Sequence, residues 1–271
     1  MFALSQRFRI SVLPADDPFA GLRRPYTLRV DVADWPGEVF TLWFPEEIRA
    51  RTPGGLAAMA TIWEQPGNEQ EWALDAGVLR HAVERDAFAY EARIAARDDG
   101  LDLAMRFTNR SPEPYGDAWV NLCLRACHAS GFDDADASRT FLRFDGVWTP
   151  LSATAPGPEQ PKHRLYLTTD EVGWFIESLS GWPHALPAQR ADHPLIALVS
   201  RDGRSTAGMA GKPAAGFVSN LDEGMRCLHS NPLLGDVAPG AEVEIRTLVL
   251  FAEGGLEDAA ARADRWLAEG E

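Results

Sequence analysis

The chain contains few lysines and no long hydrophobic run, and each shortage excludes a class of function. Lys162 and Lys212 are the only lysines among 271 residues, so catalysis through a lysine Schiff base has only two candidate amines. No apolar run approaches the roughly 20 residues of a membrane-spanning helix. The amino-terminal segment lacks the charged start and apolar run of a secretory leader. We therefore expect a soluble, cytoplasmic protein.

Cysteine is also scarce, because Cys123, Cys127 and Cys227 are the only three. Cys123 and Cys127 lie four residues apart in a predicted strand. At about 3.3 Å per residue they are roughly 13 Å apart, which is too far for a disulfide. At most one of them can pair with Cys227, so we expect reduced thiols that are mostly buried.

The chain has fewer positively than negatively charged residues, and several signature motifs are missing. The formal net charge is −14, which disfavours nucleic acid and anionic membranes as partners. The sequence has no G-x-S-x-G, no Walker loop and no G-x-G-x-x-G. We therefore expect no nucleotide cofactor, and we expect no cofactor of another kind.

Alternating hydrophobic runs are what the sequence does contain. Apolar side chains alternate with polar ones along residues 88–96 and again along residues 101–107, with Asp98-Asp99-Gly100 between the runs. This pattern predicts a β-hairpin. Similar short runs recur along the chain, whereas only Pro45–Arg51 and Leu256–Glu269 have helical features. The sequence predicts an all-β antiparallel sandwich, a single domain over residues 1–271, with a short carboxy-terminal helix.

Two short motifs carry a resemblance to a known superfamily. Phe107-Thr108-Asn109-Arg110-Ser111 ends a predicted strand, and residues 237–242, VAPGAE, precede the last long one. With these motifs the chain resembles the galactose-mutarotase-like supersandwich proteins. The resemblance implies a concave sheet face that holds a carbohydrate. In aldose epimerases that face carries a histidine general acid and a glutamate general base, but the motifs do not assign those roles to residues of this chain.

Two histidines are candidates for proton transfer. His229 lies at a predicted strand end and shares a face with Cys227, and imidazole titrates near neutral pH. The alternative is a histidine that only binds its own turn. His128 is the second candidate. Together with His229 and Asp133 or Asp134 it offers a possible metal site, but no H-x-H or H-E-x-x-H spacing supports one, so we predict no metal.

Candidate ligand-binding residues fall into three groups. Asn121 and Arg125 are polar residues in an otherwise apolar strand, so their face of the strand either binds an internal carboxylate or opens into a cleft. Trp63 and Trp72 flank a polar stretch and could stack on a sugar ring, or anchor a solvated loop in the core. Arginines could converge on an anionic group or form surface ion pairs; those retained as candidates, besides Arg125, are Arg106 and Arg226.

These residues support one main hypothesis and two alternatives. The main hypothesis is a carbohydrate-active protein that uses general acid–base chemistry on a sugar or glycan: epimerisation or mutarotation, elimination, or glycoside cleavage. Its proton carriers would be His229 and His128, with Glu71 or Glu64 as the carboxylate partner. The first alternative is a carbohydrate-binding or accessory module without catalysis. The second is a metal-dependent sandwich enzyme.

Overall fold

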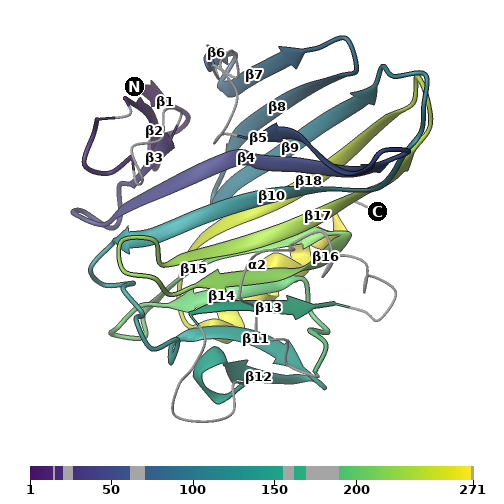
Figure 1. Cartoon of the computed structure of the whole chain (residues 1–271). Helices are drawn as coiled ribbons and strands as arrows, with labels where there is room; N and C mark the ends of the chain where they lie inside the picture. Colours follow the sequence, from purple (N-terminus) through teal and green to yellow (C-terminus); the bar gives the residue numbers. More distant parts are fainter. Residues whose placement is uncertain (15, 21–26, 62–70, 155–161, 169–188, 270–271) are drawn as a thin grey trace.

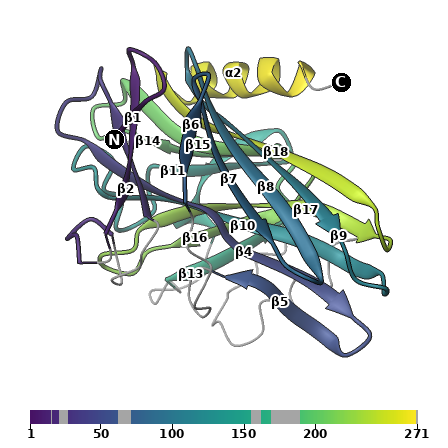
Figure 2. The same cartoon turned by 90° about the horizontal axis from the view of Figure 1, so that it is seen from above.

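A computed structural model describes residues 1–14, 16–20, 27–61, 71–154, 162–168 and 189–269. The described chain forms two nine-stranded sheets whose paired strands are all antiparallel, and one sheet packs against the other (Figures 1 and 2). The predicted all-β antiparallel sandwich is thereby confirmed. Among the described residues, no helix has the length and apolar character needed to cross a membrane.

The first sheet contains the strands that carry the candidate site. Long strands β4, β10 and β17 form its centre, and shorter strands extend it on both sides. Its order is β1 (Phe2–Ala3), β2 (Phe8–Leu13), β3 (Thr27–Val32), β4 (Val39–Thr52), β10 (Tyr115–His128), β17 (Cys227–Val237), β16 (Ala214–Asn220) and β13 (His163–Leu167), and β5 (Gly55–Thr61) also pairs with β4.

The second sheet contains the predicted hairpin and packs against the helix over part of its outer face. Its order is β12 (Val147–Pro150), β11 (Thr140–Phe144), β14 (Leu195–Val199), β15 (Ser205–Lys212), β18 (Glu242–Glu253), β9 (Gly100–Asn109), β8 (Phe88–Arg97), β7 (Val78–Glu84) and β6 (Ala73–Asp75). The short 3-10 helix η1 (Leu151–Ala153) follows β12. Helix α2 (Leu256–Ala268) lies along the outer face of this sheet, as Figure 2 shows, and packs on three of its strands, β14, β15 and β18.

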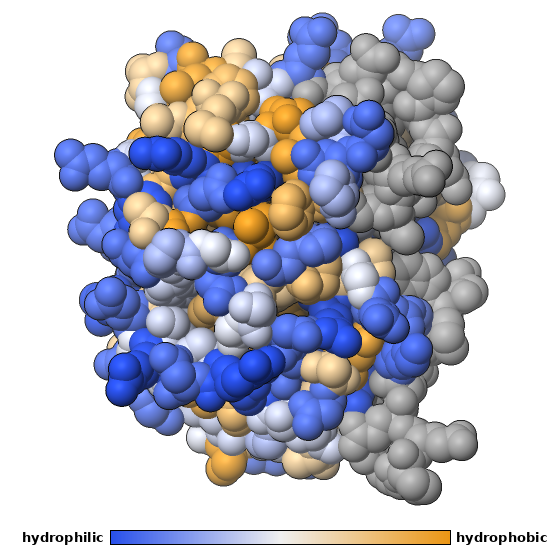
Figure 3. Space-filling view, turned by 90° about the vertical axis from the view of Figure 1, so that its left-hand side faces the viewer, coloured by the Kyte–Doolittle hydropathy of each residue, from blue (hydrophilic) through white to orange (hydrophobic). Residues whose placement is uncertain are grey.

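The main hydrophobic core lies between the two sheets, and alternation along each strand decides which side chains enter it. Leu42, Leu122 and Leu228 point into this core from β4, β10 and β17. Their neighbours in sequence point to the opposite, outer face of the first sheet, where a separate cluster is built on Trp43 and Cys123. Both faces of the central strands are therefore buried. The part of the surface that Figure 3 shows is dominated by hydrophilic side chains.

One predicted helix is wrong. Residues Pro45–Arg51 belong to strand β4, which extends from Val39 to Thr52. The Pro-Glu-Glu sequence resembles a helix start, but Phe40, Leu42 and Phe44 before it alternate with the period of a strand. Pairing with β10 on one side and β5 on the other outweighs the local helical preference.

Gly100, at the β8–β9 hairpin, lies so close to the backbone of β18 that Gly100→Ala should destabilise the protein strongly. A Cβ atom at Gly100 would overlap the backbone carbonyl oxygen of Val249 on β18. Because backbone atoms of a central strand cannot move aside freely, we expect a loss of about 2 kcal/mol in the free energy of unfolding. Urea denaturation measures it. Gly54→Ala is the control, since its nearest neighbour atom would be 3.7 Å away, and equal stability of both variants would contradict the packing.

Candidate functional site

A row of side chains crosses the outer face of the first sheet on its three central strands. Trp43 on β4 pairs with Cys123 on β10, and Cys123 pairs with His229 on β17. The next row contains Thr41, Arg125 and Cys227 on the same three strands. Adjacent rows on one face bring these groups into contact, although they are far apart in the sequence.

An irregularity in β4 adds a carboxyl group to this face. From Trp43 to Glu47 strand β4 advances four positions, while β10 advances only two, from Cys123 to Asn121. The extra residues form a bulge that contains Pro45, which has no N–H group to donate to the sheet. The bulge brings Glu46 to Asn121, whose Nδ2 donates a hydrogen bond of 2.7 Å to Oε2 of the carboxyl group.

Asn121 connects this carboxyl group to β17. Its Oδ1 accepts a hydrogen bond of 2.8 Å from Nδ2 of Asn231. Glu46, Asn121 and Asn231 are at most 7% exposed, so the chain of hydrogen bonds is shielded from water. Within the described part of the protein, Oδ1 of Asn231 has no hydrogen-bond partner. A buried acceptor of this kind is suited to the hydroxyl group of a ligand.

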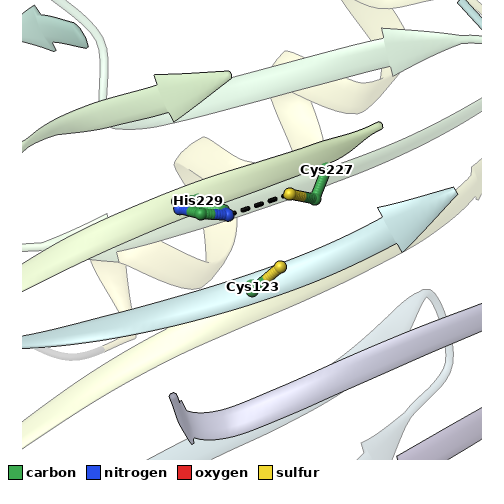
Figure 4. Close-up of side chains that lie close together, drawn as sticks. All are labelled: Cys123, Cys227 and His229. Atoms are coloured by element: carbon green, nitrogen blue, oxygen red, sulfur yellow. Dashed lines mark hydrogen bonds between the residues drawn. The ribbon is translucent and has the colours of Figure 1, made fainter. Parts of the chain in front are cut away.

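Cys227 and His229 form a second polar pair two residues apart on β17. The Sγ of Cys227 lies 3.0 Å from Nε2 of His229, and Figure 4 shows the other ring nitrogen pointing away from the sulfur. The thiol of Cys123 reaches the same place from β10. Its Sγ, the Sγ of Cys227 and a ring nitrogen of His229 all lie within 4.8 Å of one another.

The charges in this cluster favour a thiolate beside an imidazolium. Burial raises the pKa of Cys227. The hydrogen bond from Cys123 and the positive charge of His229 lower it by more than burial raises it, so the net pKa is well below the usual range. Burial lowers the pKa of His229, but the negative charges of Cys227 and Glu46 outweigh it and raise the pKa to about 9. Burial raises the pKa of Cys123, which keeps its proton and can donate it to Cys227.

The carboxyl group of Glu46 is also displaced from its usual range. Burial raises its pKa to about 8, against the opposing effect of the positive charge of His229. Each of the two groups therefore shifts the pKa of the other, and we expect their titrations to be linked. A carboxyl group and an imidazole with adjacent pKa values in one place can exchange protons with a bound substrate near pH 8.

Arg125 borders the pair and carries a buried positive charge. Its guanidinium group lies 5.2 Å from the ring of Trp43 and donates to Oγ1 of Thr41 at 3.2 Å. It also donates to the carbonyl oxygens of Phe19 and Gly224 at 3.3 and 2.7 Å. The internal carboxylate predicted for Arg125 is not its partner. The guanidinium group instead donates to carbonyl and hydroxyl oxygens and to Sγ of Cys127, and the arginine connects two loops beside the site.

Three of the residues proposed from the sequence thus lie together: His229, Asn121 and Arg125. His128 does not meet His229, because it ends β10 five residues beyond Cys123, about 16 Å from the row of His229 along the strand, although Arg125 lies close enough to affect it electrostatically. Its ring meets the edge of Phe19 at 4.9 Å. The metal site considered for His128, His229 and an aspartate is therefore not formed.

The remaining candidates lie elsewhere. Trp72 is buried in the core between the sheets, 5.3 Å from His81 by ring centroids, so it anchors its segment rather than facing the site. The backbone carbonyl of Glu71 lies 3.4 Å from Nδ1 of the same histidine, while its side chain is exposed. Trp63 and Glu64 lie outside the described residues.

The predicted arginines do not converge. Arg106 lies on the outer face of the second sheet, where it forms ion pairs with Glu242 and Glu244 at 3.3 and 3.6 Å. Arg226 forms an ion pair with Asp133. Both arginines therefore form ion pairs with acidic residues close by. Such pairs are common for surface arginines, and they are the alternative stated above.

Glu46 and Asn231 are the functional candidates that sequence reasoning missed. Glu46 was assigned to a helix, so its position on a sheet was not considered. A signal was present, since a proline inside a run with strand periodicity indicates a bulge, and bulges often redirect a side chain beside a site. Asn231 shares the face of Cys227 and His229 by simple alternation, and that spacing could have identified it.

Comparison with known proteins gives the fold its context. No protein-family model and no curated protein matches the sequence. The structure is similar to a galactose mutarotase-like protein from Lactobacillus casei, with a TM-score of 0.50 and 9% identity over 92% of this chain and 98% of that one. It is also similar to a galactose mutarotase related enzyme from Lactobacillus acidophilus, with a TM-score of 0.51 and 9% identity over 93% and 96% of the two chains.

At this level of identity the similarity concerns architecture. Both comparisons extend over nearly the full length of each chain, so the whole sandwich is shared and not only one sheet. The resemblance expected from the two sequence motifs is confirmed, and this chain has the galactose mutarotase-like supersandwich fold.

Proposed function

We propose that this protein binds a sugar on the outer face of its first sheet and interconverts the anomers of an aldose, with His229 as general acid and Glu46 as general base. The observation that carries the proposal is the pair itself. An imidazole with a pKa of about 9 and a carboxyl group with a pKa of about 8 affect each other electrostatically on one buried face. General acid–base catalysis needs two groups that hold and release protons in the same pH range.

The fold supports a carbohydrate as the substrate class. The two structural relatives are described as galactose mutarotase-like or galactose mutarotase related. Fold alone does not establish an activity, so the argument rests on the chemistry of the site. Both a histidine and a glutamate are available there, which is the combination that aldose epimerases use.

In the proposed reaction one group takes up a proton and the other gives one. Glu46 in its ionised form takes the proton from the hydroxyl group on the anomeric carbon. The imidazolium of His229 gives a proton to the ring oxygen as the bond between that oxygen and the anomeric carbon breaks. An open-chain aldehyde results. Rotation and the reverse proton transfers close the ring on either face, so the protein returns to its starting protonation state.

The neighbouring residues keep the two groups in their roles. The thiolate of Cys227 accepts a hydrogen bond from Nε2 of His229, which stabilises the protonated ring and leaves the second ring nitrogen for the substrate. Asn121 holds the carboxyl group of Glu46 at 2.7 Å. Oδ1 of Asn231 then supplies an acceptor for a sugar hydroxyl. Cys227 and Asn121 are positioning residues in this scheme.

Measurement of anomer exchange tests the proposal. A panel of aldoses is examined by magnetisation-transfer NMR between the α and β anomeric protons, with wild type, His229→Gln and His128→Gln. We expect wild type and His128→Gln to accelerate exchange of at least one aldose equally, and His229→Gln to lose 10²-fold or more. Equal rates for His229→Gln and wild type would contradict the role of His229. Absence of acceleration for every aldose by the wild type would contradict the proposed activity.

A further inference from the structure

We propose that Cys123, Cys227 and His229 form a binding site for a thiophilic divalent cation, with Zn²⁺ as the representative ion. The ligand atoms would be the two Sγ atoms and Nε2 of the imidazole ring. They come from facing positions of β10 and β17 and lie within 4.8 Å of one another. Figure 4 shows the three side chains turned toward a common point between the two strands. All three are at most 1% exposed.

The spacing of the three atoms is close to that of a tetrahedral zinc site. Zinc binds sulfur at about 2.3 Å and imidazole nitrogen at about 2.0–2.1 Å, which places neighbouring ligand atoms roughly 3.5–3.8 Å apart. Here Nε2 of His229 lies 3.0 Å from Sγ of Cys227, and no pair exceeds 4.8 Å. Movements of less than about 1 Å, available through side-chain rotation, would bring the atoms to the ligand spacing.

The register of the strands favours a metal over a disulfide. Cys123 pairs with His229, and Cys227 pairs with Arg125, so the two cysteines are diagonal neighbours. Diagonal positions on adjacent strands have Cα atoms about 7–8 Å apart, at or beyond the limit for an unstrained disulfide. A metal ion bridges the longer gap, since it inserts two metal–sulfur bonds between the sulfur atoms.

The surroundings suit a soft cation better than a hard one. Trp43 and Met225 pack against the two cysteines and supply no oxygen ligand. The carboxyl group of Glu46 acts electrostatically on both cysteines, but it is already bonded to Asn121. Thiolate and imidazole ligands bind Zn²⁺ and Cd²⁺ in preference to Mg²⁺ and Ca²⁺, which require oxygen. Two thiolates neutralise the charge of a divalent ion, so the ion and its two sulfur ligands together add no net charge beside the buried guanidinium group of Arg125. Binding converts the Cys123 thiol and the His229 imidazolium to their deprotonated forms, and two protons pass to the solvent.

Metal binding would exclude the catalytic role proposed for His229. An imidazole whose Nε2 coordinates a metal is neutral and no longer gives a proton at moderate pH. The cation and the acid function therefore compete for one side chain, so zinc would inhibit anomer exchange. This consequence depends on the proposed function, whereas the metal site itself does not.

Cobalt spectroscopy tests the site without reference to any activity. Reduced, metal-free full-length protein is titrated with Co²⁺, and then Zn²⁺, Cd²⁺ or Mg²⁺ is added to compete. We expect one equivalent of Co²⁺ to produce thiolate-to-cobalt charge-transfer absorption in the near ultraviolet and tetrahedral bands in the visible. Zn²⁺ and Cd²⁺ should abolish these bands, and Mg²⁺ should leave them unchanged.

Three variants and a matched control locate the ligands. Cys123→Ser, Cys227→Ser and His229→Gln should each weaken Zn²⁺ binding by at least about 100-fold. Cys127→Ser should bind as the wild type does, because Cys127 lies at the far end of β10 and donates to the carbonyl of Gly224 instead. Circular dichroism checks that the serine variants remain folded. Absence of the cobalt bands in wild type, unchanged affinity in the ligand variants, or a Cys123–Cys227 disulfide that forms in air and accounts for both thiols would overturn the proposal.

Discussion

The rate of anomer exchange should follow a narrow bell-shaped pH profile with its maximum between about pH 8 and 9. The rising side reports loss of the proton from Glu46, whose pKa is raised to about 8, because only the ionised carboxylate acts as a base. The falling side reports loss of the proton from His229, whose pKa is raised to about 9. Because the two groups are coupled, the observed values belong to the pair.

Substitution at each position separates the two sides of this profile. Glu46→Gln removes the base, and we expect the rate to fall by 10²- to 10⁴-fold. His229→Gln removes the acid, with a loss of similar size. His128→Gln provides the control and should retain both the rate and the shape of the profile. A maximum near pH 6, with sides at ordinary histidine and carboxylate pKa values, would show that the pair is not the one that moves protons.

Glu46→Gln should also stabilise the protein at neutral pH by on the order of 3 kcal/mol. The unfolded chain loses the Glu46 proton near pH 4.5, whereas the folded protein keeps it until about pH 8. Between these values the folded state binds more protons, so stability falls as pH rises. Glutamine has the shape of the protonated carboxyl group and can still accept the hydrogen bond from Asn121, but it does not ionise. The difference between variant and wild type should therefore be small at pH 4 and grow toward pH 8.

Urea denaturation at pH 4, 6 and 8 measures this difference. Glu91→Gln is the control, because Glu91 is a half-exposed residue in an ion pair with Arg80, and its removal should change stability by less than about 0.5 kcal/mol at each pH. A variant at Glu46 that is destabilised at pH 8, or whose difference from wild type does not depend on pH, would contradict the buried, protonated carboxyl group. Stabilisation together with loss of activity would be the usual signature of a functional residue.

The sequence was sufficient to predict the fold where local signals were strong. The alternation on both sides of Asp98-Asp99-Gly100 predicted the β8–β9 hairpin, and the two central turn residues are Asp98 and Asp99. Helix α2 was predicted from helical spacing, and the structure ends it at Ala268, one residue before the expected end. These features depend on residues close together in the sequence, so pattern alone determines them.

The candidate site was predicted only in part, because it depends on long-range register. Asn121 and Arg125 were recognised as polar groups in an apolar strand. His229 was predicted at a strand end, which is wrong, because β17 continues past it to Val237. The convergence of these three residues with Cys123 requires β10 to pair with β17 at one particular alignment, which no local pattern specifies. Glu46 reaches the site through a bulge in β4, and the sequence around it favours a helix start when considered alone. Tertiary pairing decided the conformation of that segment.

The pKa of His229 is the most direct test of the account, since acid catalysis and the charge of the Cys227–His229 pair both depend on it. Two-dimensional ¹H–¹⁵N NMR of the imidazole nitrogens follows the titration in wild type and in Glu46→Gln. We predict a midpoint near pH 9 in wild type and a lower one in the variant, because the negative charge of Glu46 helps to hold the proton. A midpoint at or below 6.5 in wild type, unaffected by the substitution, would contradict the coupled pair.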